Sequence, residues 1–446
     1  MNCRGIPPLD PIRSEGDIAN VNEILQQFAI DPLLAVLFFA FVAGIAGTLV
    51  FLFDRMGGPF AKAVNPVTGK LASVEGLRGI LAASVVAHHG YLWYFYTQTG
   101  QWTGEGTIVF VRCAVFGVTQ FFFISGFLFW RKLMKTGSIP LGNFYLSRFI
   151  RIGPAYYTCV GAAILTGLVF NGFRLQVPPG ALVAPLLSWL LFSVSGRLDV
   201  NHMDVARITC GVTWTLALEW MFYLSLPFLG WFSRRARRLV YFALTFGTAF
   251  LVCFYLRTLT VDWPGLNTLL VVLSTYAKFM LIGFGGGILI AALELRIRGW
   301  MRFVEGRKDW LLLALYLGYL MIPGIPAIGL VLLLPAFALV VNGASLFGFL
   351  TCRPVRLLGV ISYPLYLVHG MVFYIAMRLR GGIHAVNLYA YLGQTAACVA
   401  VILALATIIH LAVERPTMRL SEHIARRARL PQAGLLEPAP QESAGR

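Results

Sequence analysis

The stretch SVEGLRGILAASVVAHHGYLWYFY, residues 73–96, decides how the rest of the chain is interpreted. Its apolar length predicts a transmembrane helix, yet it carries Glu75, Arg78, His88 and His89. Ionisable groups are costly in hydrocarbon, so they usually face a protein interior or a water-filled cavity. At about 100° per residue, Glu75, Arg78 and His89 share one helix face, and His89 lies roughly 16 Å beyond Arg78. The stretch predicts either a functional face inside a bundle or polar groups that only satisfy one another.

The composition agrees with a polytopic membrane protein. Of 446 residues, 58% are hydrophobic and only 12% are charged. The formal net charge of +17 does not indicate a nucleic-acid partner, because cytoplasmic loops of membrane proteins collect Lys and Arg. The seven cysteines show no paired spacing, and no His, Cys or acidic residues recur at metal-ligand spacing. We therefore expect neither a disulfide framework nor a metal site.

The apolar segments predict an all-α fold with eleven membrane spans. The apolar piece 181–195 is ambiguous, and the positive-inside rule decides it. If it does not cross, most Lys and Arg fall on one side, with the N-terminus outside and the C-terminus in the cytoplasm. It is then a re-entrant or surface-lying segment of an outer loop. The expected spans are 32–53, 73–96, 108–130, 152–171, 212–232, 239–257, 269–292, 310–322, 327–349, 361–380 and 389–413.

The two ends of the chain read differently from the membrane region. Residues 1–31 are polar and proline-containing, which predicts an extracytoplasmic tail before the first span. Residues 419–446, rich in Arg, Pro, Ala and Glu, are expected to form a cytoplasmic, disordered tail. We find no internal repeat and no second, soluble domain.

Two of the predicted spans carry polar side chains that serve either contacts between helices or a functional site. FFFISGFLFW, residues 121–130, places Ser125 and Gly126 inside an apolar span, where they serve helix packing or an interhelical hydrogen bond. VTWTLALEWMFYLSLP, residues 212–227, buries Glu219 one turn before Tyr223. An intramembrane carboxylate is a functional candidate by default, and a structural hydrogen bond to Tyr or Trp is the alternative.

Basic residues mark one helix entry. NFYLSRFIRIGPAYY, residues 143–157, puts Arg148 and Arg151 one turn apart, with Pro154 expected in the first turn of the helix. Two guanidinium groups on one face can hold a phosphate, and the alternative is ordinary anchoring at the membrane surface.

Two further stretches lie near the end of the chain. GVISYPLYLVHG, residues 359–370, places His369 in mid-span, as a functional group or a satisfied core residue. LAVERP, residues 411–416, ends the last span with Glu414, which is a functional group or a salt-bridge partner of Arg415. His410 and Lys278 also lie within spans, without a partner that the sequence identifies.

These motifs, taken in order, resemble the acyltransferase 3 family of integral-membrane O-acyltransferases. The resemblance rests on Arg78 and His89, the FFxISGF run, Arg-x-x-Arg followed by Ile-Gly-Pro, WTLxxEWxFY, SYPLYLVH and VERP, and it covers about residues 70–418. It implies a ten-helix acyltransferase core, to which 32–53 adds one extra transmembrane helix. No single motif is specific, whereas six in order are.

The resemblance implies transfer of an acyl group, commonly acetyl, from cytoplasmic acyl-CoA to a hydroxyl of an extracytoplasmic carbohydrate or exported metabolite. It assigns importance to Arg78 with His89, to Arg148 with Arg151, and to Glu414. No permanently bound cofactor is expected; acyl-CoA is a donor substrate. The expected partners are the carbohydrate or other hydroxyl acceptor, the lipid bilayer of the inner (plasma) membrane and a second copy of the chain.

The chemistry needs a base for the hydroxyl proton and positive charge for the oxyanion. We expect His89 to be the base or an acyl carrier, with Glu219 and Glu414 as further catalytic groups. Substrate binding is expected from the arginines and from Ser125, Tyr223 and His369. Two other classes remain: a proton-coupled transporter or flippase, in which the same groups form a proton relay, and a membrane sensor or structural subunit.

Overall fold

The computed structural model describes residues 71–102, 108–136, 141–194, 196–232, 264–321, 326–382 and 388–427, with isolated positions in 42–55 and 247–256. Every regular element in these ranges is helical, and the extended pairing there is an isolated bridge between Val200 and Met203. This confirms the all-α class. The predicted tail 1–31, most of the spans 32–53 and 239–257, and residues 428–446 lie outside the described residues.

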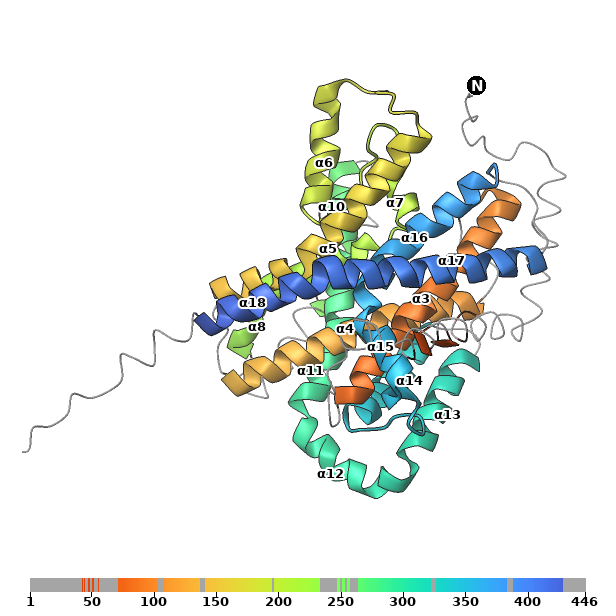
Figure 1. The fold of residues 1–446 in the computed structure, drawn as a ribbon. Helices are drawn as coiled ribbons and strands as arrows, with labels where there is room; N and C mark the ends of the chain where they lie inside the picture. The colour runs from red at the N-terminus through yellow and green to blue at the C-terminus, as the bar shows by residue number, and fades with distance from the viewer. Residues whose placement is uncertain are drawn as a thin grey trace, which may run out of the picture.

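The helices follow one another along the chain (Figure 1). The first half contains α3 (Leu71–Thr99), α4 (Ile108–Thr136), α5 (Leu141–Phe170), α6 (Val183–Leu190), α7 (Val205–Ile208) and α8 (Thr213–Phe232). The second half contains α10 (Pro264–Phe279), α11 (Gly285–Ala292), α12 (Glu294–Val304), α13 (Lys308–Met321), α14 (Pro326–Val341), α15 (Arg353–Val360), α16 (Ser362–Leu379), α17 (Leu388–Ile409) and α18 (Arg415–Arg427).

Four helical segments of the described chain are long and apolar enough to cross a membrane. Helices α15 and α16 form a further candidate, a pair bent by 71° at their junction. The fold is therefore that of an α-helical membrane protein, while the ten-helix core stays a prediction. The four segments are Phe110–Lys135, Gly142–Phe170, Leu273–Ala292 and Ala390–Ser421.

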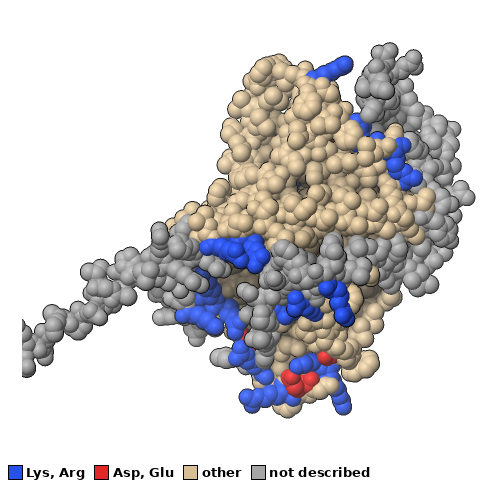
Figure 2. Space-filling view, in the orientation of Figure 1, with Lys and Arg blue, Asp and Glu red and all other residues tan. Residues whose placement is uncertain are grey.

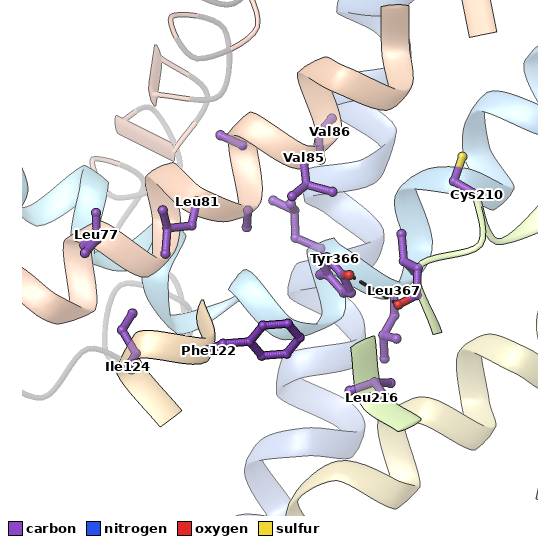
Figure 3. Close-up of a cluster of buried hydrophobic side chains, with 14 of the residues drawn as sticks. Leu77, Leu81, Val85, Val86, Phe122, Ile124, Cys210, Leu216, Tyr366 and Leu367 are labelled. Atoms are coloured by element: carbon purple, nitrogen blue, oxygen red, sulfur yellow. Dashed lines mark hydrogen bonds between the residues drawn. The ribbon is translucent and has the colours of Figure 1, made fainter. Parts of the chain in front are cut away.

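Helix α3, which the opening stretch predicts, is not one of these apolar candidates, and its packing gives the reason. It lies against α4, α15 and α16, so that Leu77 and Leu81 are fully buried. Figure 3 shows Leu77, Leu81 and Val85 of α3 on the side that α4 and α16 occupy. A helix that other helices enclose does not need an apolar surface all round, because protein rather than lipid covers it.

Glycines set the distance between α4 and α11. A Cβ atom at Gly126 would lie 2.2 Å from the carbonyl oxygen of Phe284, and one at Gly287 would lie 2.1 Å from that of Phe123. No side chain fits at either position, so the two backbones touch. The packing interpretation of Gly126 is confirmed, and the contact fixes the neighbouring Ser125 on the inner face of α4.

We expect Gly126→Ala to lower the free energy of unfolding by about 1–3 kcal/mol, because the added methyl group forces α4 away from α11. The matched control is Gly161→Ala on α5, where a Cβ atom meets nothing within 4 Å. That change gains helix propensity and is expected to be neutral or stabilising by up to about 1 kcal/mol. Thermal unfolding in detergent measures both. Equal melting temperatures for the two variants would contradict the described packing.

Helix α5 starts earlier than the sequence suggests. It begins at Leu141, so Pro154 lies inside the helix and not in its first turn, and this detail of the prediction is wrong. The missing N–H of Pro154 leaves the Ile150 carbonyl oxygen without its usual donor, and neighbouring groups can satisfy such a freed backbone group in a membrane helix. The longer helix carries Arg148 and Arg151 in its interior.

The ambiguous piece 181–195 forms the short helix α6, preceded by a turn of 3₁₀ helix at Pro179–Leu182. Eight residues are too few to cross a bilayer. Leu187 and Leu190 are at least half exposed, as expected for an apolar segment that lies against lipid. At the other end of the chain, residues 419–427 belong to α18, so the start of the predicted disordered tail is helical.

Positive side chains gather on one end of the molecule. Figure 2 shows Lys and Arg concentrated over the lower half, where Figure 1 places α12 and α18, with few on the upper half. This distribution is the one that the positive-inside rule describes. The orientation that assigns this end to the cytoplasm stays a prediction.

Candidate active site

A cavity of about 170 Å³ opens between α3, α4, α5, α8, α16 and the end of α17. It collects residues from segments that are far apart in the sequence. Seven of the predicted site residues line it: Arg78, Ser125, Arg148, Arg151, Glu219, Tyr223 and Glu414. The two predicted histidines, His89 and His369, do not line it.

Three arginines place positive charge on the cavity wall. Arg78 comes from α3, and Arg148 and Arg151 come from one face of α5. In the part of the chain that the structure describes, none of the three has a carboxylate within ion-pair distance. The Arg148 guanidinium stacks over the Phe129 ring at 5.3 Å, and its buried Nε lacks a partner among the described atoms. Such a wall is suited to an anionic ligand.

Glu219 is one of two carboxylates that face these arginines. It accepts a short hydrogen bond from the Tyr223 hydroxyl, one turn along α8, and a longer one of 3.4 Å from Ser125 Oγ. The Tyr145 hydroxyl of α5 donates to the backbone oxygen of Tyr223 at 3.1 Å and so helps to position Tyr223. The structural alternative for Glu219, a hydrogen bond to a tyrosine, is therefore confirmed. A functional role for this carboxylate, which lines the cavity, stays a prediction.

Glu414 is the second carboxylate, and it has an unexpected partner. A π-helical turn, His410–Glu414, follows α17 and brings His410 Nδ1 within 2.7 Å of Glu414 Oε2. Both side chains are buried. The sequence offered Arg415 as the partner, whereas the described contact is with His410, which had none. π turns recur at functional sites because they re-aim side chains on the wide side of the turn.

His89 and His369 form a pair beside the cavity. His89 Nδ1 lies 3.0 Å from the Val85 carbonyl oxygen and 3.0 Å from His369 Nε2. A carbonyl oxygen only accepts, so His89 Nδ1 carries the proton and donates it. His369 Nδ1 is bound in the same way to the Leu365 carbonyl oxygen at 3.3 Å, which leaves His369 Nε2 as an acceptor. The network thereby leaves the lone pair on His89 Nε2, the form that a general base requires.

The predicted common face of α3 is divided between two environments. Glu75 pairs with Arg356 of α15 at 2.9 Å, outside the cavity. Arg78 enters the cavity, and His89 lies one layer away from it. Tyr366 forms the boundary: it lines the cavity, and its ring centroid is 6.2 Å from that of His369. Arg78 and His89 therefore lie at different heights along α3, as predicted. The cavity that contains Arg78 does not extend to His89.

Sequence reasoning missed four polar residues of the cavity wall. Tyr366 contacts Thr215 Oγ1 at 2.9 Å and donates to the Val212 carbonyl oxygen at 3.2 Å, and Figure 3 marks a hydrogen bond at the Tyr366 hydroxyl. The Oγ of Ser362 has no partner among the described atoms, and Tyr363 donates to the Ile152 carbonyl oxygen at 2.8 Å. Three of the four belong to the motif SYPLYLVH. The sequence prediction used only the ionisable residue of this motif, His369, and not its hydroxyl groups.

Comparisons with known proteins identify the family of the chain. A family model described as "Acyltransferase domain" matches residues 71–411. Peptidoglycan O-acetyltransferase OatA of Listeria monocytogenes is 27% identical over 174 residues, which are 36% of this chain and 25% of that protein. Nodulation protein 10 of Rhizobium leguminosarum bv. viciae is 27% identical over 183 residues, 38% of this chain and 47% of that protein. The chain thus spans a quarter to about half of these relatives. No solved structure matches it.

Proposed function

Because the chain belongs to the acyltransferase 3 family, we propose that it is a membrane O-acyltransferase that moves an acyl group, acetyl above all, from cytoplasmic acyl-CoA to a hydroxyl of an extracytoplasmic carbohydrate or exported metabolite. The name of the Listeria relative, peptidoglycan O-acetyltransferase, supports the carbohydrate class. The observation that carries the proposal is the cavity in which three arginines, none ion-paired to a carboxylate among the described residues, meet buried hydroxyl groups.

The arginine wall is where we place coenzyme A. Its phosphates would pair with the guanidinium groups of Arg78, Arg148 and Arg151, which form no ion pair with a carboxylate among the described residues although Glu219 and Glu414 lie on the same cavity. Guanidinium groups bind phosphate through two parallel hydrogen bonds, and the unpartnered Arg148 Nε is one free donor. The basic surface on the same molecule favours the cytoplasm as the donor side.

The thioester then lies at the other end of the cavity, beside Tyr366 and Ser362. His89 takes the proton of the acceptor hydroxyl on Nε2, since Nδ1–H is already donated to Val85 and His369. The hydroxyl oxygen attacks the acyl carbon, the C–S bond breaks, and coenzyme A leaves as the thiol after it receives that proton. We assign the donation to the oxyanion to the Ser362 hydroxyl, which has no hydrogen-bond partner among the described atoms, with the positive charge of the arginines behind it; the single proton of the Tyr366 hydroxyl is already donated to Val212 or Thr215.

His369 is a positioning residue in this scheme. Its Nε2 accepts from His89 Nδ1 at 3.0 Å and so selects the tautomer and the ring orientation of His89. Glu219, held by Tyr223 and Ser125, faces the same cavity and is placed to bind acceptor hydroxyls. Glu414 with His410 supplies a second carboxylate close to Arg78.

The proposal is tested with the purified full chain, [¹⁴C]acetyl-CoA and carbohydrate extracted from the cell envelope. We expect label in alkali-labile esters on the carbohydrate, together with an equal amount of free coenzyme A thiol. A protein that moves sugar or acyl-bearing substrate across liposomes without breaking the thioester would instead be a transporter, and the enzyme assignment would be wrong.

A further inference from the structure

A cysteine that the proposed reaction does not use lies against the histidine pair. The nearest ligand atoms of His89, His369 and Cys210 all lie within 4.8 Å of one another, and the three side chains are buried. His89 comes from α3, His369 from α16, and Cys210 from the turn after α7. Figure 3 shows the Cys210 sulfur at this turn, beside α16. Because the three residues are far apart in sequence, no spacing within one segment could reveal the cluster.

The backbone is shaped to bring this thiol to the imidazoles. Cys210 has φ 52°, a left-handed conformation that costs a non-glycine residue of order 1–3 kcal/mol, and Gly211 continues it with φ 67°. Gly370, directly after His369, permits the approach, because a Cβ atom there would lie 2.7 Å from the Cys210 nitrogen. The turn is held from outside by Arg197, which donates to the Gly211 carbonyl oxygen at 2.9 Å.

The side chain of Cys210 is also oriented. The indole N–H of Trp93 donates to Cys210 Sγ at 3.2 Å, so the sulfur acts as an acceptor. A donor of this kind stabilises negative charge on sulfur. Among the described residues, other buried thiols such as that of Cys159 accept no such hydrogen bond. Strain, a close glycine and an oriented sulfur at one point are more than apolar packing of a cysteine requires.

We propose that His89, His369 and Cys210 form a binding site for Zn²⁺, and that the bound ion switches the acyltransferase off. Two imidazole nitrogens and one thiolate are a ligand set that Zn²⁺ prefers. In a tetrahedral site with bonds of about 2.0–2.3 Å, ligand atoms lie roughly 3.3–3.6 Å apart. The separations of 3.0 Å between His369 Nε2 and His89 Nδ1 and of at most 4.8 Å overall need small side-chain shifts to reach this geometry, together with transfer of the His89 proton from Nδ1 to Nε2.

Chemical balance is simple at this site. Binding replaces the thiol proton of Cys210, which is released to solvent, and uses one lone pair of each neutral imidazole. His89 binds the ion through Nδ1, and its proton moves to Nε2, so Nε2 no longer has a lone pair with which to take a hydroxyl proton. The fourth coordination position is left to water. The switch rests on the proposed role of His89, whereas the binding of Zn²⁺ does not.

Binding is tested first, without any activity. The purified full chain is incubated with Zn²⁺ and desalted, and its zinc content is measured by mass spectrometry. We expect about one Zn²⁺ per wild-type chain, and the same for Cys159→Ser, which removes a buried thiol of α5 outside the cluster. Cys210→Ser and His369→Gln are expected to lose at least about 10-fold in affinity while eluting as the same monodisperse species. Retention of Zn²⁺ by both variants would overturn the site.

The second arm measures acyl transfer from [¹⁴C]acetyl-CoA against Zn²⁺ concentration. We expect Zn²⁺ to inhibit the wild type and Cys159→Ser, and Cys210→Ser to require at least about 10-fold more Zn²⁺ with unchanged activity in its absence. Inhibition that is equal in Cys210→Ser and wild type would overturn the switch. If Zn²⁺ binds through Cys210 but no chain transfers acetyl at any Zn²⁺ concentration, the failure is that of the proposed function, and the switch falls with it while the metal site stands.

Discussion

His89→Asn is expected to lower acyl transfer by about 10²–10⁴-fold while the protein still inserts and folds. Loss of a positioned general base has this magnitude. Asparagine is the sharpest replacement, because its amide nitrogen can take the position of the ring Nδ1 and keep the donation to the Val85 carbonyl oxygen. What it lacks is the lone pair of Nε2. The rate is measured as released coenzyme A thiol per mole of monodisperse protein.

The matched control is His88→Asn. His88 is the next residue of α3, is likewise largely buried, and donates from Nδ1 to the Phe110 carbonyl oxygen at 2.9 Å. The same substitution there removes an imidazole of similar setting that the mechanism does not use. We expect activity within a few-fold of the wild type. An active His89→Asn variant, or equal losses at both positions, would contradict the assignment of His89 as base.

Arg148→Gln is expected to raise the KM for acetyl-CoA by about 10–100-fold, with a smaller change in kcat. A charge-assisted hydrogen bond to phosphate contributes about 1.5–3 kcal/mol, which is a factor of this size. Arg148→Lys is expected to recover little of the loss. The guanidinium stacks on Phe129 at 5.3 Å and presents a planar fork, whereas an ammonium group is a single hydrated charge.

Arg302→Gln is the control for charge alone. Arg302 is an exposed arginine of α12, outside the cavity-lining set. The same loss of one positive charge there is expected to leave KM within about 2-fold at physiological salt, because screening weakens interactions beyond about 8 Å. If Arg302→Gln raised KM as much as Arg148→Gln, the arginines would act as a general basic surface and not as a binding site.

The sequence predicts well whatever depends on one helix. The apolar stretch 73–96 predicts α3, and the i, i+3 spacing predicts that Arg148 and Arg151 share a face, as they do at the cavity. The ends of helices are less predictable. Pro154 suggested a helix start, but the helix begins at Leu141 and continues through the proline.

Contacts between distant segments could not be predicted in the same way. Nothing in the local pattern tells that Cys210 approaches His369, because the approach depends on the absent side chain of Gly370 on another helix. The His410–Glu414 contact is different, because it joins residues four apart, a spacing that places side chains on one helix face and that the sequence contained. The ordered motifs did bring seven of the predicted residues to one cavity, since they come from helices that surround it.

The two functional side chains of α3 lie on different sides of Tyr366. Arg78 is in the cavity, and His89 lies behind Tyr366, whose hydroxyl is held by Thr215 and by the Val212 carbonyl oxygen at 3.2 Å. In the proposed reaction the acyl end of the donor and the acceptor hydroxyl meet at this boundary, with the nucleotide part remaining at the arginines. Donor and acceptor then enter from opposite sides of one helix bundle.

The central claim is that acyl-CoA binds in this cavity, with its phosphates at the arginines and its thioester toward His89. A cryo-electron-microscopy structure of the full chain with coenzyme A tests it most directly. We predict phosphate oxygens within hydrogen-bond distance of Arg148 and Arg151, and the sulfur beside Tyr366. Coenzyme A bound elsewhere, with the arginines unliganded, would contradict the account.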